Sequence, residues 1–266
     1  SRVSSDFSSP ASLVLEDADD LFDEKDAAHP GFARWSLHNT RAHKKPGYVA
    51  VTLSLKKTGV PAGDVSDSQL DAIAELAEQY SFEEVRNTHD QNMVLADVEQ
   101  PKLLELWHKL RDLGLATPNI GLLSDIICCP GGDYCALANA KSIPVAEAIQ
   151  RRFEDLDYLF DIGDLNLNIS GCMNACGHHH IGHIGILGVD KKGEEFYQVS
   201  LGGHSGRNAQ LGKILGPSFA QDDMPDVISK LIDVYVENRT PEERFIDTYH
   251  RIGIEVFKER VYAPHH

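Results

Sequence analysis

The stretch Ser170–Gly185, SGCMNACGHHHIGHIG, holds two cysteines four positions apart with four histidines close behind them. Thiolate and imidazole groups are the side chains that bind zinc, other transition metals and iron–sulfur clusters. Disulfide frameworks spread their cysteines along the chain, whereas clustering indicates a metal site in a reducing compartment. All the cysteines of this chain lie within one short region, and they are Cys128, Cys129, Cys135, Cys172 and Cys176.

The spacing of these cysteines leaves three kinds of site open. They form the pairs Cys129-x5-Cys135 and Cys172-x3-Cys176, with 36 residues between the pairs. A structural zinc site tolerates the shorter spacing, and the histidines could compete as ligands, but the longer spacing is loose for zinc. A disulfide site is disfavoured without a secretion signal. An iron–sulfur cluster needs converging thiolates and close backbone, which the neighbouring glycines permit, namely Gly131, Gly132, Gly171 and Gly177.

Length and charge bound the class of protein. The chain has 266 residues, enough for one large domain or two modest ones, and a formal net charge of −16. This charge argues against nucleic acid or an anionic membrane as a partner. No apolar run reaches the length of about 18 residues that a membrane-spanning helix needs. Residues 1–33 are acidic and without clear periodicity, and they indicate an arm or linker.

Residues 34–118 show the patterns of a small α+β unit. Residues 48–55 alternate like a half-buried strand, and a helix follows over 66–80 with Ser66 or Asp67 as its N-cap. Residues 83–98 indicate two short strands around a polar turn near Asp90. A second helix over 100–115 ends at Gly114. The predicted order is β-α-β-β-α.

Residues 119–266 form a second predicted unit. The Gly-rich stretch 127–135 leads into a helix expected around 136–140, and a further helix is expected over 145–153. Residues 165–170 read as a strand that delivers Cys172 from its end. Two later strands are expected to form a hairpin through the turn Asp190–Gly193. Helices are expected over 223–238 and from Thr240 onward, the last with Thr240 as N-cap and Glu243 closing a capping box.

These motifs together resemble the sirohaem-dependent sulfite and nitrite reductase family. CPGGDYC with SGCMNACG is similar to the family's C-x5-C and C-x3-C motif, and CMNAC fits its C-x-N-x-C loop at Asn174. VRNTHDQNMVLADV is similar to the family's R-x-T-x-x-Q-N strand–turn–strand, with Arg86, Thr88, Gln91 and Asn92 at the matching places. The family is built from two related halves, and residues 34–266 resemble the second of them.

The resemblance implies a fold class and a set of site residues. The expected fold is α+β, a ferredoxin-like β-α-β-β-α half-domain over 34–118 followed by a mixed α/β sirohaem and 4Fe–4S domain over 119–266. Cys129, Cys135, Cys172 and Cys176 would hold the cluster, and the Cys176 thiolate would also ligate the sirohaem iron. Cys128 is an extra cysteine that could replace Cys129 by a shift of one residue. The residues expected to contact sirohaem are Arg86, Thr88, Gln91, Asn92 and Asn174.

Some of these assignments depend on the resemblance alone. Arg86 would by itself read as a solvent-facing strand residue, and Thr88, Gln91 and Asn92 are of types that turns attract. His178, His179, His180 and His183 are not assigned as ligands, because three successive residues on a strand cannot face one centre. His204 and Arg207 lie in a Gly-rich loop that either approaches the tetrapyrrole or is an ordinary loop.

The resemblance also implies a reaction and partners. The family reduces sulfite to sulfide, or nitrite to ammonia, by six electrons. Sulfite is the preferred substrate here, with the cluster-bearing half of a cytoplasmic, assimilatory enzyme as the expected role. The expected partners are an electron donor such as ferredoxin or a flavoprotein, and the N-terminal half of the parent enzyme, without nucleic acid or membrane. The alternatives are a non-catalytic iron–sulfur electron-transfer module and a zinc-stabilised binding domain.

Overall fold

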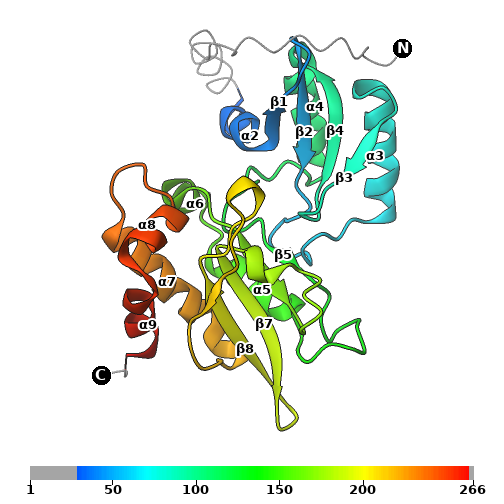
Figure 1. Cartoon of the computed structure of the whole chain (residues 1–266). Helices are drawn as coiled ribbons and strands as arrows, with labels where there is room; N and C mark the ends of the chain where they lie inside the picture. The colour runs from blue at the N-terminus through cyan, green and yellow to red at the C-terminus, as the bar shows by residue number, and fades with distance from the viewer. Residues whose placement is uncertain (1–28, 264–266) are drawn as a thin grey trace. The chain divides into compact units, whose positions relative to one another are not determined.

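The computed structural model describes residues 29–263, which divide into two compact units (Figure 1). The N-terminal unit contains the described residues up to 57 together with 63–120. The C-terminal unit contains residues 58–62 and the described residues from 121 onward. Most of the acidic arm expected over 1–33 lies outside the described residues.

The N-terminal unit is a four-stranded antiparallel sheet with helices that share its apolar core. The strand order is β1-β2-β4-β3, so β3 is an edge strand. The predicted strand–helix–strand–strand–helix order is present, and one further helix and strand precede it. Its main elements are α2 (Phe32–Asn39), β1 (Thr40–Ala42), β2 (Tyr48–Leu53), α3 (Asp67–Tyr80), β3 (Val85–Asn87), β4 (Met93–Glu99) and α4 (Leu103–Asp112).

Helix α3 begins where its capping residues predict. The Ser66 hydroxyl oxygen accepts a hydrogen bond from the Gln69 N–H at 3.1 Å, and the Gln69 side chain accepts one from the Ser66 N–H at 3.0 Å. This reciprocal pair satisfies two backbone donors that a helix start leaves unpaired. The buried stripe comprises Ile73, Leu76, Ala77 and Tyr80. Leu70 and Ala74, which the helical period of the sequence would add to this stripe, are exposed.

The C-terminal unit is built on a five-stranded mixed sheet of order β5-β6-β7-β8-β9. Strands β5, β6 and β7 run parallel to one another, and β8 and β9 continue the sheet antiparallel. The fold is therefore α+β, with the mixed second domain that the sequence predicted. Its strands are β5 (Ile127–Cys128), β6 (Leu167–Ser170), β7 (Ile184–Lys191), β8 (Glu194–Leu201) and β9 (Lys213–Ile214). Its α-helices are α5 (Ile143–Arg152), α6 (Leu156–Ile162), α7 (Met224–Asn238), α8 (Phe245–Ile252) and α9 (Ile254–Tyr262).

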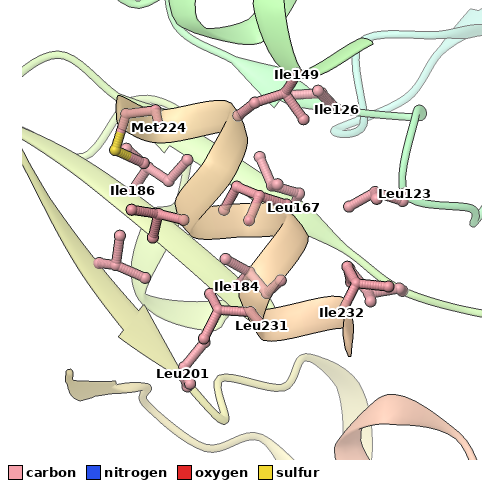
Figure 2. Close-up of a cluster of buried hydrophobic side chains, with 14 of the residues drawn as sticks. Leu123, Ile126, Ile149, Leu167, Ile184, Ile186, Leu201, Met224, Leu231 and Ile232 are labelled. Carbon is pink, nitrogen blue, oxygen red and sulfur yellow. The ribbon is translucent and has the colours of Figure 1, made fainter. Parts of the chain in front are cut away.

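Helix α7 lies across this sheet and closes its core. Figure 2 shows Leu231 and Ile232 of α7 among strand residues such as Leu167 and Ile184, all of them fully buried. Burying one Leu or Ile side chain contributes roughly 2 kcal/mol to folding. We therefore expect the core of the unit to hold its strand ends in place whether or not a cofactor is bound.

Two helix predictions in the C-terminal unit were wrong. Residues 136–140 form turns, because the N–H groups of Asn139 and Ala140 both donate to the Gly171 carbonyl, at 2.8 and 3.1 Å, instead of continuing a helix. The last predicted helix starts at Phe245 rather than after Thr240. The Glu243 carboxylate does accept from the Thr240 N–H at 2.9 Å, but Arg251 of α8 also binds it, and the segment stays a separate turn.

The hairpin prediction was confirmed. Strands β7 and β8 pair along their full length, and Lys191 opposes Glu194 at the turn. Lys192 and Gly193 both have positive φ there, which is what a two-residue hairpin turn with the twist of the strands requires.

Among residues 29–263, no helix combines the length and the apolar character that crossing a bilayer demands.

Candidate metal centre

Both cysteine pairs start at the carboxyl ends of neighbouring parallel strands. Strand β5 ends at Cys128 and β6 ends at Ser170, and the two strands pair with Cys128 opposite Ile169. Cys129 and Gly171–Cys172 therefore leave the sheet at the same edge. The carboxyl ends of parallel strands are where open α/β sheets commonly bind ligands.

A hydrogen bond to a cysteine sulfur connects the loops that follow β5 and β6. The Gly171 N–H donates to the Cys129 Sγ at 3.0 Å, across 42 positions of sequence. The Gly171 carbonyl accepts from two N–H groups of the other loop, those of Asn139 and Ala140. Backbone N–H groups that point at cysteine sulfur are what an iron–sulfur site uses to stabilise its thiolates.

Glycines let the two loops pack backbone to backbone. A Cβ at Gly171 would lie 2.6 Å from the Ala140 carbonyl oxygen and 2.8 Å from the Gly131 Cα. A Cβ at Gly131 would lie 2.5 Å from the Ser142 nitrogen, and Gly131 also has a φ of +60°. A Cβ at Gly177 would meet the Ile169 carbonyl oxygen at 1.9 Å. The sequence predicted that the backbone packs closely at Gly131, Gly171 and Gly177, and the structure confirms this.

The four proposed ligand cysteines differ in exposure. Cys129 and Cys172 are buried, Cys135 is half-buried and Cys176 is exposed, and none of them forms a disulfide. Within residues 29–263, no three His, Cys, Asp or Glu side chains are gathered so as to hold a single metal ion. Four thiols spread over two adjoining loops suit a cluster of several irons, which takes four cysteine ligands around its periphery. The donor set present in the chain thus fits a 4Fe–4S cluster.

Cys128 points away from this edge. It lies in β5, where its side chain is part of the hydrophobic core, and its thiol donates to the Cys129 carbonyl at 3.2 Å. Successive side chains of a strand face opposite sides, so Cys128 and Cys129 are directed differently. This orientation favours Cys129 over Cys128 as the ligand from this pair.

The histidine run is not a strand, so the geometric reason given for excluding it was wrong. His179–Ile181 is a short 3₁₀ helix, and His178 before it has a left-handed φ of 53°. His179 is buried with its Nδ1 unpartnered, and its Nε2 lies 3.3 Å from the Nδ1 of His180. Burial is the larger cause and the neighbouring His180 ring the smaller one, and together they lower the pKa of His179 to about 4.

His183 is buried as a neutral ring. Its Nδ1 accepts from the Asn166 N–H at 3.2 Å, so in the neutral ring the Nε2 carries the proton and points at the His204 Nδ1, 3.3 Å away. Burial is the main cause that lowers its pKa to about 4, and His204 and Arg244 act in the same direction, as does His250. His204 of the Gly-rich loop is therefore a partner of His183, a contact that sequence analysis did not foresee.

We expect His183 to make the protein less stable as the pH falls from about 6.5 to about 4. An unfolded histidine takes up a proton near pH 6.5, whereas the folded ring resists protonation down to about pH 4. Below pH 6.5 the unfolded chain therefore binds more protons, and His183 alone lowers the free energy of unfolding by about 2 kcal/mol between pH 7 and pH 5, with His179 acting in the same direction. Urea unfolding at these two pH values measures this loss. A His183→Gln variant should lose less, and an equal loss in both proteins would contradict the assignment.

The residues expected to contact sirohaem fall in both units. Asn174 is exposed in the cysteine loop of the C-terminal unit, in a turn closed by the Ala175 N–H and the Cys172 carbonyl at 3.1 Å. Arg86 lies on edge strand β3 of the N-terminal unit, exposed and paired with Glu84 at 2.5 Å. To bind a cofactor carboxylate, the Arg86 side chain would have to release Glu84.

Thr88, Gln91 and Asn92 build the turn between β3 and β4. The Thr88 N–H donates to the Asn92 carbonyl at 2.9 Å, and the Thr88 hydroxyl accepts from the Asn92 N–H at 3.1 Å. The buried Asn92 side chain accepts from the Leu55 N–H at 3.0 Å, and Gln91 has a left-handed φ of 56°. Thr88 and Asn92 therefore stabilise this turn by hydrogen bonds that need no cofactor.

Ser142 is a residue near the cysteines that sequence analysis missed. It occupies the N-cap position of α5, but its side chain makes no capping hydrogen bond. Its Oγ lies instead 3.6 Å from the Cys129 Sγ. A serine just before a Pro-containing helix start reads as an N-cap, and nothing in the sequence signals a partner thirteen positions upstream.

Two family models match the chain, one in each unit. The model described as the nitrite and sulphite reductase 4Fe-4S domain matches residues 122–266. The chain belongs to the nitrite and sulphite reductase family. The model described as the nitrite/sulfite reductase ferredoxin-like half domain matches residues 42–113 of this reductase-family chain. The family resemblance stated from the cysteine motifs is confirmed, and membership supports both the 4Fe–4S cluster and sirohaem as cofactors.

Known proteins resemble the chain over different shares of their length. A sulfite reductase (ferredoxin) of Mycobacterium tuberculosis is 31% identical over 69% of this chain and 35% of its own length. An assimilatory-type sulfite reductase of Nitratidesulfovibrio vulgaris is 25% identical over 76% of this chain and 88% of its own length. The solved structure of the Mycobacterium tuberculosis NirA protein superposes with a TM-score of 0.67 at 28% identity, covering 82% of this chain and 41% of that one. The chain of this reductase family thus spans about a third of the length of the first curated relatives that it matches.

Proposed function

We propose that this chain is the cluster-bearing C-terminal half of an assimilatory sulfite reductase haemoprotein. Cys129, Cys135, Cys172 and Cys176 would hold a 4Fe–4S cluster, and the Cys176 thiolate would link it to the iron of sirohaem. The bound cofactors would supply the six-electron reduction of sulfite to sulfide. The chain's own residues would hold the two centres in contact and shield them from water.

One observation carries this proposal. Two sequence-distant cysteine loops leave adjacent parallel strands and meet where the Gly171 N–H donates to the Cys129 Sγ at 3.0 Å. This contact brings the Cys129 sulfur next to Gly171, the residue before Cys172. It therefore supports a cluster shared by the two cysteine pairs. Backbone donors and glycine contacts are already in place there.

The exposed rim of these loops supports the position proposed for sirohaem. Cys176 is exposed, and three large apolar side chains of the same loops are exposed by 73–83%, namely Tyr134, Leu137 and Met173. Large apolar side chains exposed on both cysteine loops support the proposal that a bound group covers these loops. A flat tetrapyrrole ligated by Cys176 would cover it. Arg86, Thr88, Gln91, Asn92 and Asn174 remain the proposed contacts to its polar edge.

The substrate and partners follow the family in this proposal. Sulfite is preferred, and nitrite is the alternative, since both names stand in the family descriptions. We also propose a reduced electron donor such as ferredoxin or a flavoprotein, and a second half that precedes this one in the parent enzyme. The alignment over 88% of the Nitratidesulfovibrio vulgaris relative supports testing the chain alone as well. The clustering of the cysteines, four of which are proposed cluster ligands, supports a reducing, cytoplasmic location.

The proposal is tested by loading and turnover. The chain purified without oxygen is expected to hold about four irons and four labile sulfides, and to bind sirohaem. With reduced methyl viologen as electron source, alone or with the N-terminal half, it should consume sulfite faster than nitrite. Zinc without iron would overturn the proposal. Both cofactors bound without consumption of either anion would leave the non-catalytic electron-transfer module as the function.

A further inference from the structure

Ser142 lies in the centre of the contact between the two cysteine loops. Its side chain is fully buried, at 0% exposure, and its Oγ is 3.6 Å from the Cys129 Sγ. Although it holds the N-cap position of α5, its hydroxyl is not used to cap that helix. A buried hydroxyl needs a hydrogen-bond partner, and the cysteine sulfur is the partner that the structure provides.

The space around this hydroxyl is made by two missing side chains. A Cβ at Gly131 would lie 2.6 Å from the Ser142 Oγ, and a Cβ at Gly171 would lie 3.0 Å from it. Gly131 belongs to the first cysteine loop and Gly171 to the second. The hydroxyl therefore fills a gap that exists only because both loops carry glycine at their contact.

The direction of the hydrogen bond follows from the chemistry of the sulfur. This step rests on the proposed function, in which Cys129 is a deprotonated cluster ligand. A thiolate has no proton to give, so the Ser142 hydroxyl must donate to it. The Gly171 N–H donates to the same sulfur at 3.0 Å, which gives Cys129 one backbone and one side-chain donor.

We infer that Ser142 tunes the cluster by donating a hydrogen bond to the Cys129 sulfur, and so raises its reduction potential. One electron added to the cluster adds one negative charge, while Cys129 stays a thiolate and Ser142 keeps its proton. Hydrogen bonds to cluster sulfurs stabilise that added charge, since a donor gains more from the more negative acceptor. Ser142 is thus a positioning residue that makes the cluster easier to reduce.

A redox titration of the loaded protein tests the inference. In Ser142→Ala, the ratio of reduced to oxidised cluster at the wild-type midpoint should fall about tenfold, which is about 59 mV for a one-electron couple. Ser200→Ala is the matched control. Ser200 is also a buried serine of the same unit, but its Oγ bonds the Gly185 carbonyl at 3.5 Å rather than a sulfur. The control should keep the wild-type midpoint.

The outcomes separate the inference from the proposed function. A wild-type chain that assembles no cluster overturns the proposed function and, with it, the role of Ser142. A cluster with the same midpoint in Ser142→Ala and wild type overturns only the role of Ser142. An equal shift in Ser200→Ala would also overturn it, because any lost buried hydroxyl would then act alike.

A measurement on the wild-type protein covers the case in which Ser142→Ala fails to assemble a cluster. Both protons exchange only when the buried site opens, and a hydroxyl proton then exchanges with deuterium faster than an amide proton such as that of Gly171, because its intrinsic exchange rate is higher. Electron–nuclear double resonance on the reduced cluster after brief transfer to D₂O should therefore show the loss of one strongly coupled proton. Its persistence until the amides exchange would contradict donation by Ser142.

Discussion

Replacing Gly171 by alanine is expected to abolish cluster incorporation and to lower the free energy of unfolding by about 3 kcal/mol. The new Cβ would lie 2.6 Å from the Ala140 carbonyl oxygen and 2.8 Å from the Gly131 Cα. Both neighbours are backbone atoms, which cannot swing away as the end of a side chain can. The two cysteine loops would have to separate, and the hydrogen bond from the Gly171 N–H to the Cys129 Sγ would be lost with them.

Gly132→Ala is the matched control for this substitution. It lies in the first cysteine loop, its φ is not positive, and its nearest contact for a Cβ is 3.4 Å away. We expect it to keep its iron and most of its stability. Urea unfolding and iron content of the two variants, measured side by side, decide the matter. Full iron loading of Gly171→Ala would mean that the loop contact is unnecessary for the cluster.

The second large effect is expected from a pair of neighbouring cysteines. Cys129→Ala should lose nearly all bound iron, because it removes a proposed ligand that already receives a backbone hydrogen bond. Cys128→Ala should keep its iron and lose about 1 kcal/mol of stability, because its side chain is packed in the apolar core. The same substitution one position apart thus separates the ligand from the core residue.

Iron and labile-sulfide analysis of both variants measures this difference. The opposite pattern, with iron lost in Cys128→Ala and retained in Cys129→Ala, would establish the register shift that the extra cysteine allows. Iron lost in both, together with a cooperative unfolding transition close to that of the wild type, would show that both sulfurs contribute to assembly.

The regular elements could be predicted wherever hydrophobic periodicity and turn chemistry agreed. Strand β2 alternates cleanly, helix α3 carries a capping box at Ser66, and the β7–β8 hairpin has Lys192–Gly193 at its tip. Helices α2, α6 and α9 are not predicted, because with 8, 7 and 9 residues they are too short to show a clear helical period. The sequence predicts a helix over residues 136–140, because nothing local shows that the N–H groups of Asn139 and Ala140 donate to the Gly171 carbonyl.

The candidate site could be predicted as a set of residues but not as an arrangement. The cysteine spacing suggested which sulfurs belong together, and the neighbouring glycines suggested close backbone. The sequence could not show that Cys128 faces the core, that His183 bonds His204, or that Ser142 reaches a sulfur instead of capping its helix. Each of these depends on which loop lies opposite, a tertiary fact that no local pattern encodes.

The parallel pairing of β5 with β6 has a consequence for how such chains diverge. The distance between the two cysteine pairs is set by the hydrogen bonds of adjacent strands, whereas the part of the crossover after Ser142, with α5 and α6, supplies none of the hydrogen bonds that join the two cysteine loops. Insertions or deletions in that crossover can therefore accumulate over evolutionary time without moving either thiol. Sequence drift should be slowest at the two strand exits and at the residues up to Ser142 that contact them, and fastest in the rest of the connection.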